Sequence, residues 1–262
     1  MKQILIATIV LLSVASCGNS RATKAKETVP EKEPVAVADS VTGDHNNVDT
    51  LATDAGLMIR SSKEETEAEK EQKLDKKRAR TAFKNGVEYY KQGELEQAKD
   101  AFKRVLEYSP EDNKACHYLG KIYYDLKEND IALSYYEDAV RFDDTDSTSM
   151  VAAGLILFEK GDFNGAIEYY NMAIKIAPRY ALAFYNRGTL LGLQKNYGGA
   201  VVDMNRAIEI DPNNSKYYMN RGLANHYLKR NLQACEDWEK ASSMGNAEAK
   251  KALKLYCKKI EK

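Results

Sequence analysis

The chain has 262 residues, and its 39 basic and 39 acidic side chains give a formal net charge of zero at pH 7. A balanced charge produces no overall field that would attract a nucleic acid or an anionic bilayer. The length and the hydrophobic content of 44% agree with an exported soluble domain. We therefore expect no nucleic-acid partner.

The first 17 residues have the organisation of a bacterial secretion signal. Lys2 is followed by an apolar run from Ile4 to Val14 and by small residues that end at Cys17. The run is shorter than the roughly 20 apolar residues that span a bilayer. The ending Val-Ala-Ser-Cys resembles a lipobox, which implies removal of residues 1–16 and attachment of lipid, palmitate included, to Cys17. The alternative is an ordinary signal peptide in which Cys17 is incidental.

The next two segments differ in charge and composition. Residues 17–60 contain no aromatic side chain and are rich in Ser, Thr, Ala, Val, Asp and Glu. Because such a segment buries too little apolar surface to offset its ordering entropy, we predict a disordered tether. Residues 61–78 carry acids early and bases late, which complements a helix dipole and predicts a charged helical extension. The alternative is a docking arm for an acidic partner through Lys76, Lys77, Arg78 and Arg80.

A repeat of 34 residues without insertions fills residues 79–245, and its copies begin at residues 79, 113, 147, 181 and 215. We number the places of each copy from its first residue. Place 8 is always glycine, place 20 always alanine, and place 24 large. These residues are Gly86, Gly120, Gly154, Gly188 and Gly222; Ala98, Ala132, Ala166, Ala200 and Ala234; and Phe102, Tyr136, Tyr170, Met204 and Trp238.

The order of glycine, alanine, large side chain and closing proline at this period resembles the tetratricopeptide repeat (TPR). The resemblance implies an all-α, right-handed solenoid of about five helix-turn-helix repeats. First helices are expected near 79–91, 113–126, 147–159, 181–193 and 215–228, and second helices near 95–108, 129–142, 163–176, 197–210 and 231–243. Residues 246–262, with apolar residues on one side and lysines elsewhere, are expected to form a capping helix.

In TPR proteins the first helices line a concave groove, with places 2, 5, 9, 12 and 13 facing it. The resemblance therefore implies a partner-binding groove that is aromatic and mixed in charge, suited to a peptide with apolar anchors. The alternative is that its aromatic residues only pack between repeats. Lys at place 5 and Asn at place 9, which clamp a terminal carboxylate in some TPRs, occur in no copy. The candidate groove residues are Phe83, Tyr90, His117, Lys121, Tyr124, Leu155, Phe158, Tyr185, Met219, His226 and Tyr227.

Two further pairings are expected near the C-terminal end. If the chain reverses near Gly245, Cys235 and Cys257 lie side by side on antiparallel helices, which predicts a disulfide; the alternative is two free thiols in contact. Cys116 is expected to be a small buried side chain. We also expect Asp203 to pair with Arg221 of the following copy.

No constellation for catalysis is visible in the sequence. The three histidines lie in the tether and in two distant repeats, so neither a metal site nor a nucleophile–base pair is expected. We expect no enzyme activity, no cofactor and no metal.

Small TPR lipoproteins of the bacterial, Bacteroidetes-like envelope are the proteins that the whole pattern resembles. This implies a non-catalytic adaptor that binds an envelope protein or peptide in its groove and is anchored to the membrane through Cys17. The alternative is a structural subunit of an envelope, secretion or gliding complex that associates with itself, so a homo-oligomer is possible. Gly18 is not the Asp that signals retention in the inner membrane of some bacteria, which favours the outer membrane, facing the periplasm.

Overall fold

A computed structural model describes residues 66–257. The expected signal peptide, the expected lipidation site Cys17 and the expected tether lie outside these residues, as do residues 61–65 of the charged extension and the last five residues of the chain. In the described part of the chain, no helix is long and apolar enough to cross a membrane.

The described residues form eleven helices and no strand. The first helix, α2, is the longest, because the charged extension and the first helix of copy one are continuous. The helices are α2 (Glu67–Gln92), α3 (Leu95–Tyr108), α4 (Asn113–Asp125), α5 (Asn129–Phe142), α6 (Ser147–Glu159), α7 (Phe163–Ile176), α8 (Ala181–Leu193), α9 (Tyr197–Ile210), α10 (Ser215–Tyr227), α11 (Asn231–Ser243) and α12 (Ala247–Tyr256).

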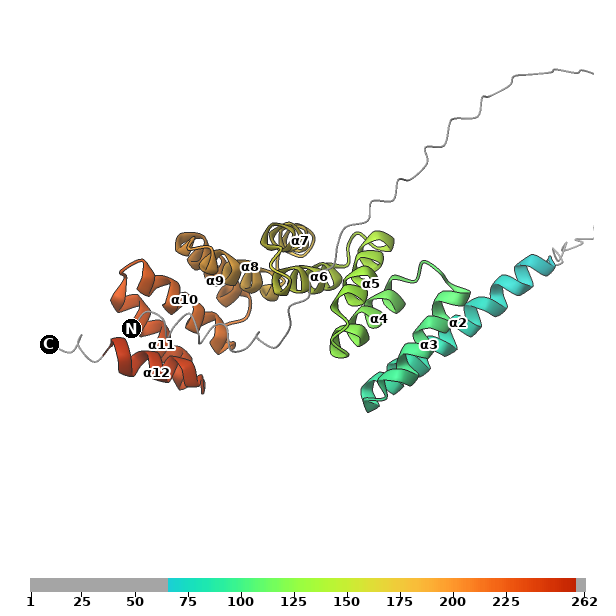
Figure 1. Ribbon diagram of the computed structural model, residues 1–262, viewed down its shortest axis with the longest axis horizontal. Coiled ribbons are helices and arrows are strands. Elements are labelled where there is room, and N and C mark those ends of the chain that lie inside the picture. Colours follow the sequence, from blue (N-terminus) through green and yellow to red (C-terminus); the bar gives the residue numbers. More distant parts are fainter. Residues whose placement is uncertain (1–65, 258–262) are drawn as a thin grey trace, which may run out of the picture.

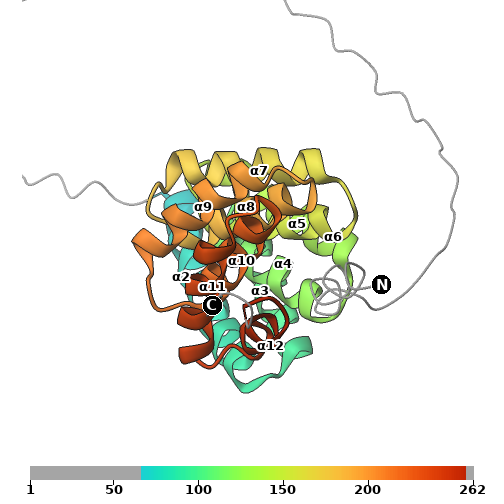
Figure 2. The ribbon, with the colours of Figure 1, turned by 90° about the vertical axis from the view of Figure 1, so that its left-hand side faces the viewer.

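Each copy of the repeat forms one antiparallel helix pair, and each pair packs on the next. The result is an elongated, curved array from α2 at one end to α12 at the other (Figure 1). Viewed from the α12 end, the pairs wind around a common axis (Figure 2). Contacts therefore form within a helix pair and between neighbouring pairs, and the predicted all-α solenoid is confirmed.

The place-8 glycines let the large place-24 side chains pack against the backbone of the paired helix. A Cβ added at Gly154 would lie 2.6 Å from the Tyr170 ring, and one added at Gly222 would lie 2.6 Å from the Trp238 ring. Tyr170 and Trp238 are each only 1% exposed. The combination of glycine and large side chain thus closes each repeat, which is the physical reason for their fixed spacing.

The turn between the two helices of every copy contains a residue in the left-handed region at place 15. In copies one and three it is a glycine, which adopts this conformation without steric cost. In the other three copies it is Lys127, Lys195 or Lys229, with φ of 66°, 65° and 64°. The three lysines therefore occupy a conformation that the sequence pattern did not indicate.

The C-terminal end is closed by α12, which packs on α11. The sulfur atoms of Cys235 and Cys257 lie 2.02 Å apart, as in a disulfide bond between these two elements. Tyr256 adds a ring contact with Trp238, with 5.7 Å between the centroids. The thiol of Cys116 is buried in the second copy, and burial raises its pKa to about 11.

The expected pairing of Asp203 with Arg221 of the next copy is wrong. Arg187 instead donates to both carboxylate oxygens of Asp203, at 2.8 and 2.7 Å, within one helix pair. Arg221 pairs with Asp237 in the same way. Both acids follow the arginine by 16 residues, which places them on the facing helix of the same hairpin. The link between copies comes from the other guanidinium nitrogen, since Arg221 also donates to Asn205 at 2.7 Å.

Candidate functional site

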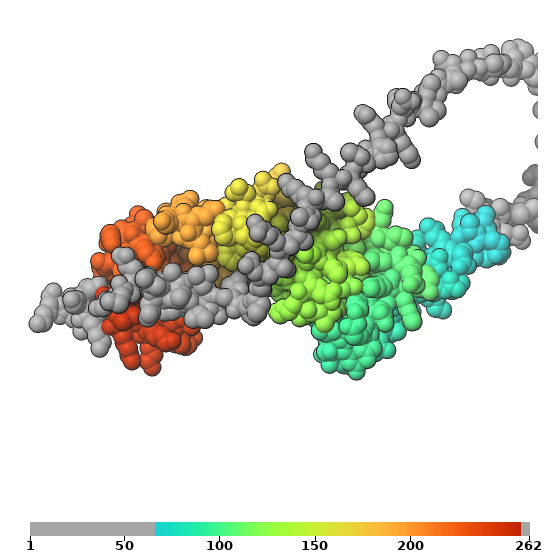
Figure 3. Space-filling view, viewed as in Figure 1, coloured from blue at the N-terminus to red at the C-terminus, as the bar shows by residue number. Residues whose placement is uncertain are grey.

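The candidate site is the inner surface of the array, which we call the groove and define by places 2, 5, 9, 12 and 13 of the first helices. Neighbouring first helices contact each other directly at α6 and α8 and at α8 and α10. The array therefore curves with its first helices on the inside. The space-filling view shows an elongated body, with the first turns of α2 projecting from one end (Figure 3).

Two of the predicted groove aromatics are bound within the protein. The hydroxyl of Tyr90 donates to Asp125 of copy two at 2.8 Å, and that of Tyr124 donates to Glu159 of copy three at 2.6 Å. In both cases place 12 of one copy bonds to place 13 of the next. Burial and the adjacent carboxylate raise the pKa of both phenols. The hydroxyls of Tyr90 and Tyr124 therefore join neighbouring repeats and are not free to bind a partner.

We call the sequence of place-12 and place-13 neighbours the seam. Its character changes along the groove. At the third step the corresponding positions hold Phe158 and Leu193, and at the fourth they hold Gly192 and Tyr227. Neither pair can form the phenol–carboxylate bond of the first two steps. The seam is thus polar in the N-terminal half of the groove and apolar in the C-terminal half.

His117 belongs to a polar network between copies two and three. Its Nδ1 lies 2.8 Å from the hydroxyl of Ser149, and the same hydroxyl donates to Asp146. The sequence carries no signal that groups His117 with Ser149, because the two residues lie 32 positions apart. Ser149 is fully buried and its oxygen lies between the other two groups, so the arrangement does not present an exposed nucleophile activated by histidine. It stabilises the contact between α4 and α6.

Most of the other candidate groove residues also take part in packing. Phe83 has edge contacts with Phe102 and Tyr118, at centroid distances of 5.4 and 5.7 Å. The Nζ of Lys121 lies 4.9 Å from the centroid of the Tyr90 ring. Leu155, Phe158, Tyr185, Met219 and His226 are half-buried.

Three exposed apolar side chains lie at groove positions of copies four and five. Leu182 is 40% exposed, Leu193 42% and Tyr227 37%. Of these, only Tyr227 is among the predicted candidates. The sequence signal for the other two was available, since they occupy places 2 and 13 of copy four.

A cavity of about 240 Å³ opens between copies four and five, and Leu193 and Tyr227 are among the residues that line it. Gly192, Leu193, Leu223 and Tyr227 line it from the first helices, and Met204 lies on the second-helix side. The ring of Tyr197 stacks on that of Tyr227 with 4.6 Å between centroids and forms one wall. The cavity lies where the seam lacks a place-12 side chain.

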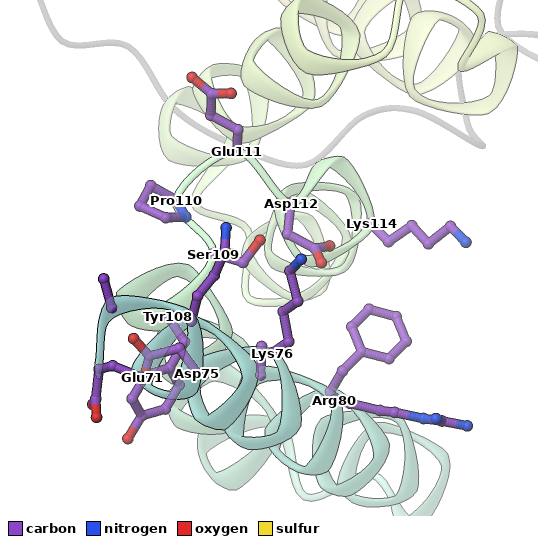
Figure 4. A pocket seen from close by; sticks show the side chains of 14 residues that line it. Glu71, Asp75, Lys76, Arg80, Tyr108, Ser109, Pro110, Glu111, Asp112 and Lys114 are labelled. Carbon is purple, nitrogen blue, oxygen red and sulfur yellow. The ribbon is translucent and has the colours of Figure 1, made fainter. Parts of the chain in front are cut away.

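A second, wider hollow of about 1080 Å³ lies at the N-terminal end, between the first turns of α2 and the loop before α4. Figure 4 shows Lys76 pointing from α2 toward the loop that carries Asp112, and Arg80 pointing away from it. The walls carry both signs of charge, and Arg78 is paired with Glu71 and Asp75 on its own helix. The hollow is therefore not a concentrated basic surface for an acidic partner.

Within residues 66–257, no group of three or more His, Cys, Asp or Glu side chains is arranged to hold a metal ion. Burial lowers the pKa of His117, and the carboxylate of Asp146, 3.9 Å away, opposes this effect. The chemistry that the described groove offers is therefore apolar contact and hydrogen bonding.

Comparison with known proteins agrees with this architecture. Three models of the tetratricopeptide repeat match residues 83–147, 154–194 and 181–214. A search of curated proteins gave no match.

Solved structures with the same fold include MamA, which is 24% identical over 66% of this chain and 94% of its own, with a TM-score of 0.58. YrrB, described as a TPR protein with an unusual peptide-binding site, is 21% identical over 71% of this chain and 97% of its own, with a TM-score of 0.59. PilW, a type IV pilus biogenesis factor, is 18% identical over 65% and 80%, with a TM-score of 0.58. The helical array of this chain is a tetratricopeptide-repeat solenoid.

Proposed function

We propose that this chain is a non-catalytic adaptor of the bacterial envelope, which holds a partner protein or peptide in its groove while lipid on Cys17 anchors it to the membrane. The observation that carries the proposal is the set of exposed apolar side chains in the C-terminal half of the groove, Leu182, Leu193 and Tyr227. Apolar residues gathered around a concave surface are typical of a protein-binding site.

The comparisons support parts of this proposal by analogy. YrrB shares the fold and is described as having a peptide-binding site, and PilW shares it and is described as a pilus biogenesis factor. Function resides in the site more than in the fold. The membrane anchor rests on the lipobox-like ending at Cys17, and the outer membrane rests on Gly18.

A cross-linked capture from native envelopes tests the adaptor role. The groove variant carries Leu182→Glu and Leu193→Glu, and the matched control carries Val202→Glu and Leu232→Glu on the second helices α9 and α11. Val202 and Leu232 are 66% and 58% exposed, so the control adds the same charges to another surface. We expect partners to be lost by the groove variant alone. Partners retained by both variants would contradict the groove assignment.

Two further measurements test the remaining parts. Labelling with a radioactive fatty acid, compared between the parent and Cys17→Ala, tests the anchor, and absence of label from the parent would refute it. Sedimentation equilibrium of the purified chain tests the alternative of self-association. A monomer over the micromolar range is expected of an adaptor with an open groove, and a tight dimer that the groove variant dissociates would favour the structural role.

A further inference from the structure

We infer that the cavity beside Gly192 binds one aromatic side chain of a partner peptide, and that an acidic residue next to this side chain pairs with Lys195. The inference rests on the proposed groove-binding function and specifies the ligand that the groove selects. Three observations carry it: the origin of the cavity, its volume, and the chemistry of its walls.

The cavity exists because copy four departs from the repeat. Place 12 holds a ring in every other copy, as Tyr90, Tyr124, Phe158 and His226, but Gly192 in copy four. A Cβ added at Gly192 would meet only the Cβ of Ala200, at 3.7 Å, which is ordinary contact. Close packing therefore does not demand a glycine here, in contrast to place 8. The protein leaves open the space that a ring of its own occupies elsewhere.

The volume fits one side chain better than a whole small-molecule ligand. The cavity measures about 240 Å³. An apolar cavity of about 150 Å³ in a protein core binds benzene, whereas pockets for drug-sized ligands begin at about 300 Å³. A phenyl or indole group therefore fits, and a whole cofactor does not.

The walls favour an apolar ring. The hydroxyl of Thr189 donates to the carbonyl oxygen of Tyr185 at 2.8 Å and accepts from Asn220 at 3.0 Å. These polar groups are therefore satisfied without a ligand. Leu223, Met204 and the stacked Tyr197 supply apolar and aromatic surface. A ring that enters this site gains contacts without leaving a buried donor or acceptor unpaired.

The charge at the cavity is basic. Lys195 is among its lining residues, and it stands in the left-handed turn between α8 and α9 with φ of 65°. No carboxylate of the described residues lies within ion-pairing distance of its Nζ. An acidic residue beside the aromatic anchor would therefore gain a partner at the rim, which gives the peptide a direction as well as an anchor.

Titration of the isotope-labelled chain with short peptides, followed by NMR, tests the inference. The peptides are acetylated nonapeptides of glycine and serine with one central anchor, which is phenylalanine, tryptophan or alanine, and flanks of either aspartate or lysine. We expect the aromatic anchors to bind about tenfold or more tightly than alanine, since burial of a ring is worth at least that factor. The lysine-flanked peptides should bind severalfold more weakly than the aspartate-flanked ones.

Gly192→Phe restores the missing ring and fills the site from within, while Gly198→Phe is the matched control. Gly198 lies on α9, and an added Cβ would meet nothing within 4 Å. We expect Gly192→Phe to lose about tenfold or more in affinity for the aromatic peptides, with the control within about twofold of the parent. Gly192→Ala, which adds a single methyl group in ordinary contact, should fall between them. Circular dichroism and melting establish that each variant is folded.

Equal binding of the phenylalanine and alanine peptides, or unchanged binding by folded Gly192→Phe, would overturn the inference. The envelope capture described above separates this failure from failure of the proposed function. If Gly192→Phe keeps partners that the groove variant with Leu182→Glu and Leu193→Glu loses, the adaptor role stands and the ring site is wrong. If both keep them, the groove itself is not the site.

Discussion

Alanine substitution should change stability in opposite directions at two helical glycines, Gly154 and Gly192, because only Gly154 packs against a ring. In Gly154→Ala, the new Cβ would lie 2.6 Å from Cε1 and 2.9 Å from Cδ1 of the Tyr170 ring. Carbon atoms in favourable contact are about 3.5–4.0 Å apart, so the ring would have to move by about 1 Å. Tyr170 is 1% exposed and packs in the core with Met150 and Ala166, which leaves it little room to do so.

The expected magnitude follows from two opposing effects. Overpacking of a well-packed core costs about 1–3 kcal/mol, and alanine gains up to about 1 kcal/mol over glycine within a helix. We expect Gly154→Ala to lower the free energy of unfolding by about 1–2 kcal/mol. Gly192→Ala has no such clash, because its Cβ would meet Ala200 at 3.7 Å, and should be neutral or stabilising.

Urea unfolding followed by circular dichroism at 222 nm measures both variants against the parent. A solenoid can unfold in more than one step, so the midpoint of the transition and its slope are compared together. A Gly154→Ala midpoint at or above that of the parent would refute the reasoning, because it would show that the ring yields without cost. A loss of stability by Gly192→Ala equal to that of Gly154→Ala would show that any side chain at these helix positions is harmful, whatever it contacts.

Three further predictions concern other contacts. Replacement of Cys235 and Cys257 by serine should lower the stability of the C-terminal end by about 3 kcal/mol, as expected for a loop of 22 residues, and hydrogen exchange should show the loss in α11 and α12 first. Arg221→Ala should lower the free energy of unfolding by about 2–4 kcal/mol in chemical denaturation, because Asp237, 5% exposed, would lose its cationic partner. Joint replacement of Arg221 and Asp237 by Met and Leu should cost less, since no buried charge would remain. His117 has a pKa below 6.5 in the folded chain, so the unfolded chain binds more protons, and stability should fall as the pH drops through about 6.5; in His117→Gln this part of the pH dependence should vanish.

The fold could be predicted because one short pattern, typical of a helix pair, occurs five times in register. A glycine, an alanine and a large side chain at fixed spacing, repeated every 34 residues, leave few arrangements other than stacked hairpins. In such an array each helix pair contacts only its neighbours, so the order of the pairs along the chain fixes which helices meet. The prediction that failed, Asp203 with Arg221, required a choice between the same hairpin and the next one. Sequence spacing alone does not make that choice, and the facing geometry of α8 and α9 does.

The groove was harder to predict than the fold. In the sequence, an aromatic residue at place 12 that is free to bind a partner looks the same as one that bonds to the next repeat. The acids that bind Tyr90 and Tyr124 stand 35 residues further along, at place 13 of the following copy. The pairing of places 12 and 13 across copies is visible in the sequence once the solenoid geometry is known. Before that, nothing distinguishes these tyrosines from exposed ones.

Departures from a repeat therefore carry more functional information than the repeat itself. Place 8 is glycine in every copy because the paired large side chain occupies the space of a Cβ, and this constraint is structural. Packing does not require a glycine at position 192. This glycine replaces the ring that the other copies carry at place 12, in the half of the groove where the seam is apolar. At Gly192 a larger side chain would fit, yet the ring of the other copies is missing. An external group can therefore take the place of that ring. We therefore propose that the C-terminal half of the groove selects the partner, while the phenol–carboxylate bonds of the N-terminal half join the repeats.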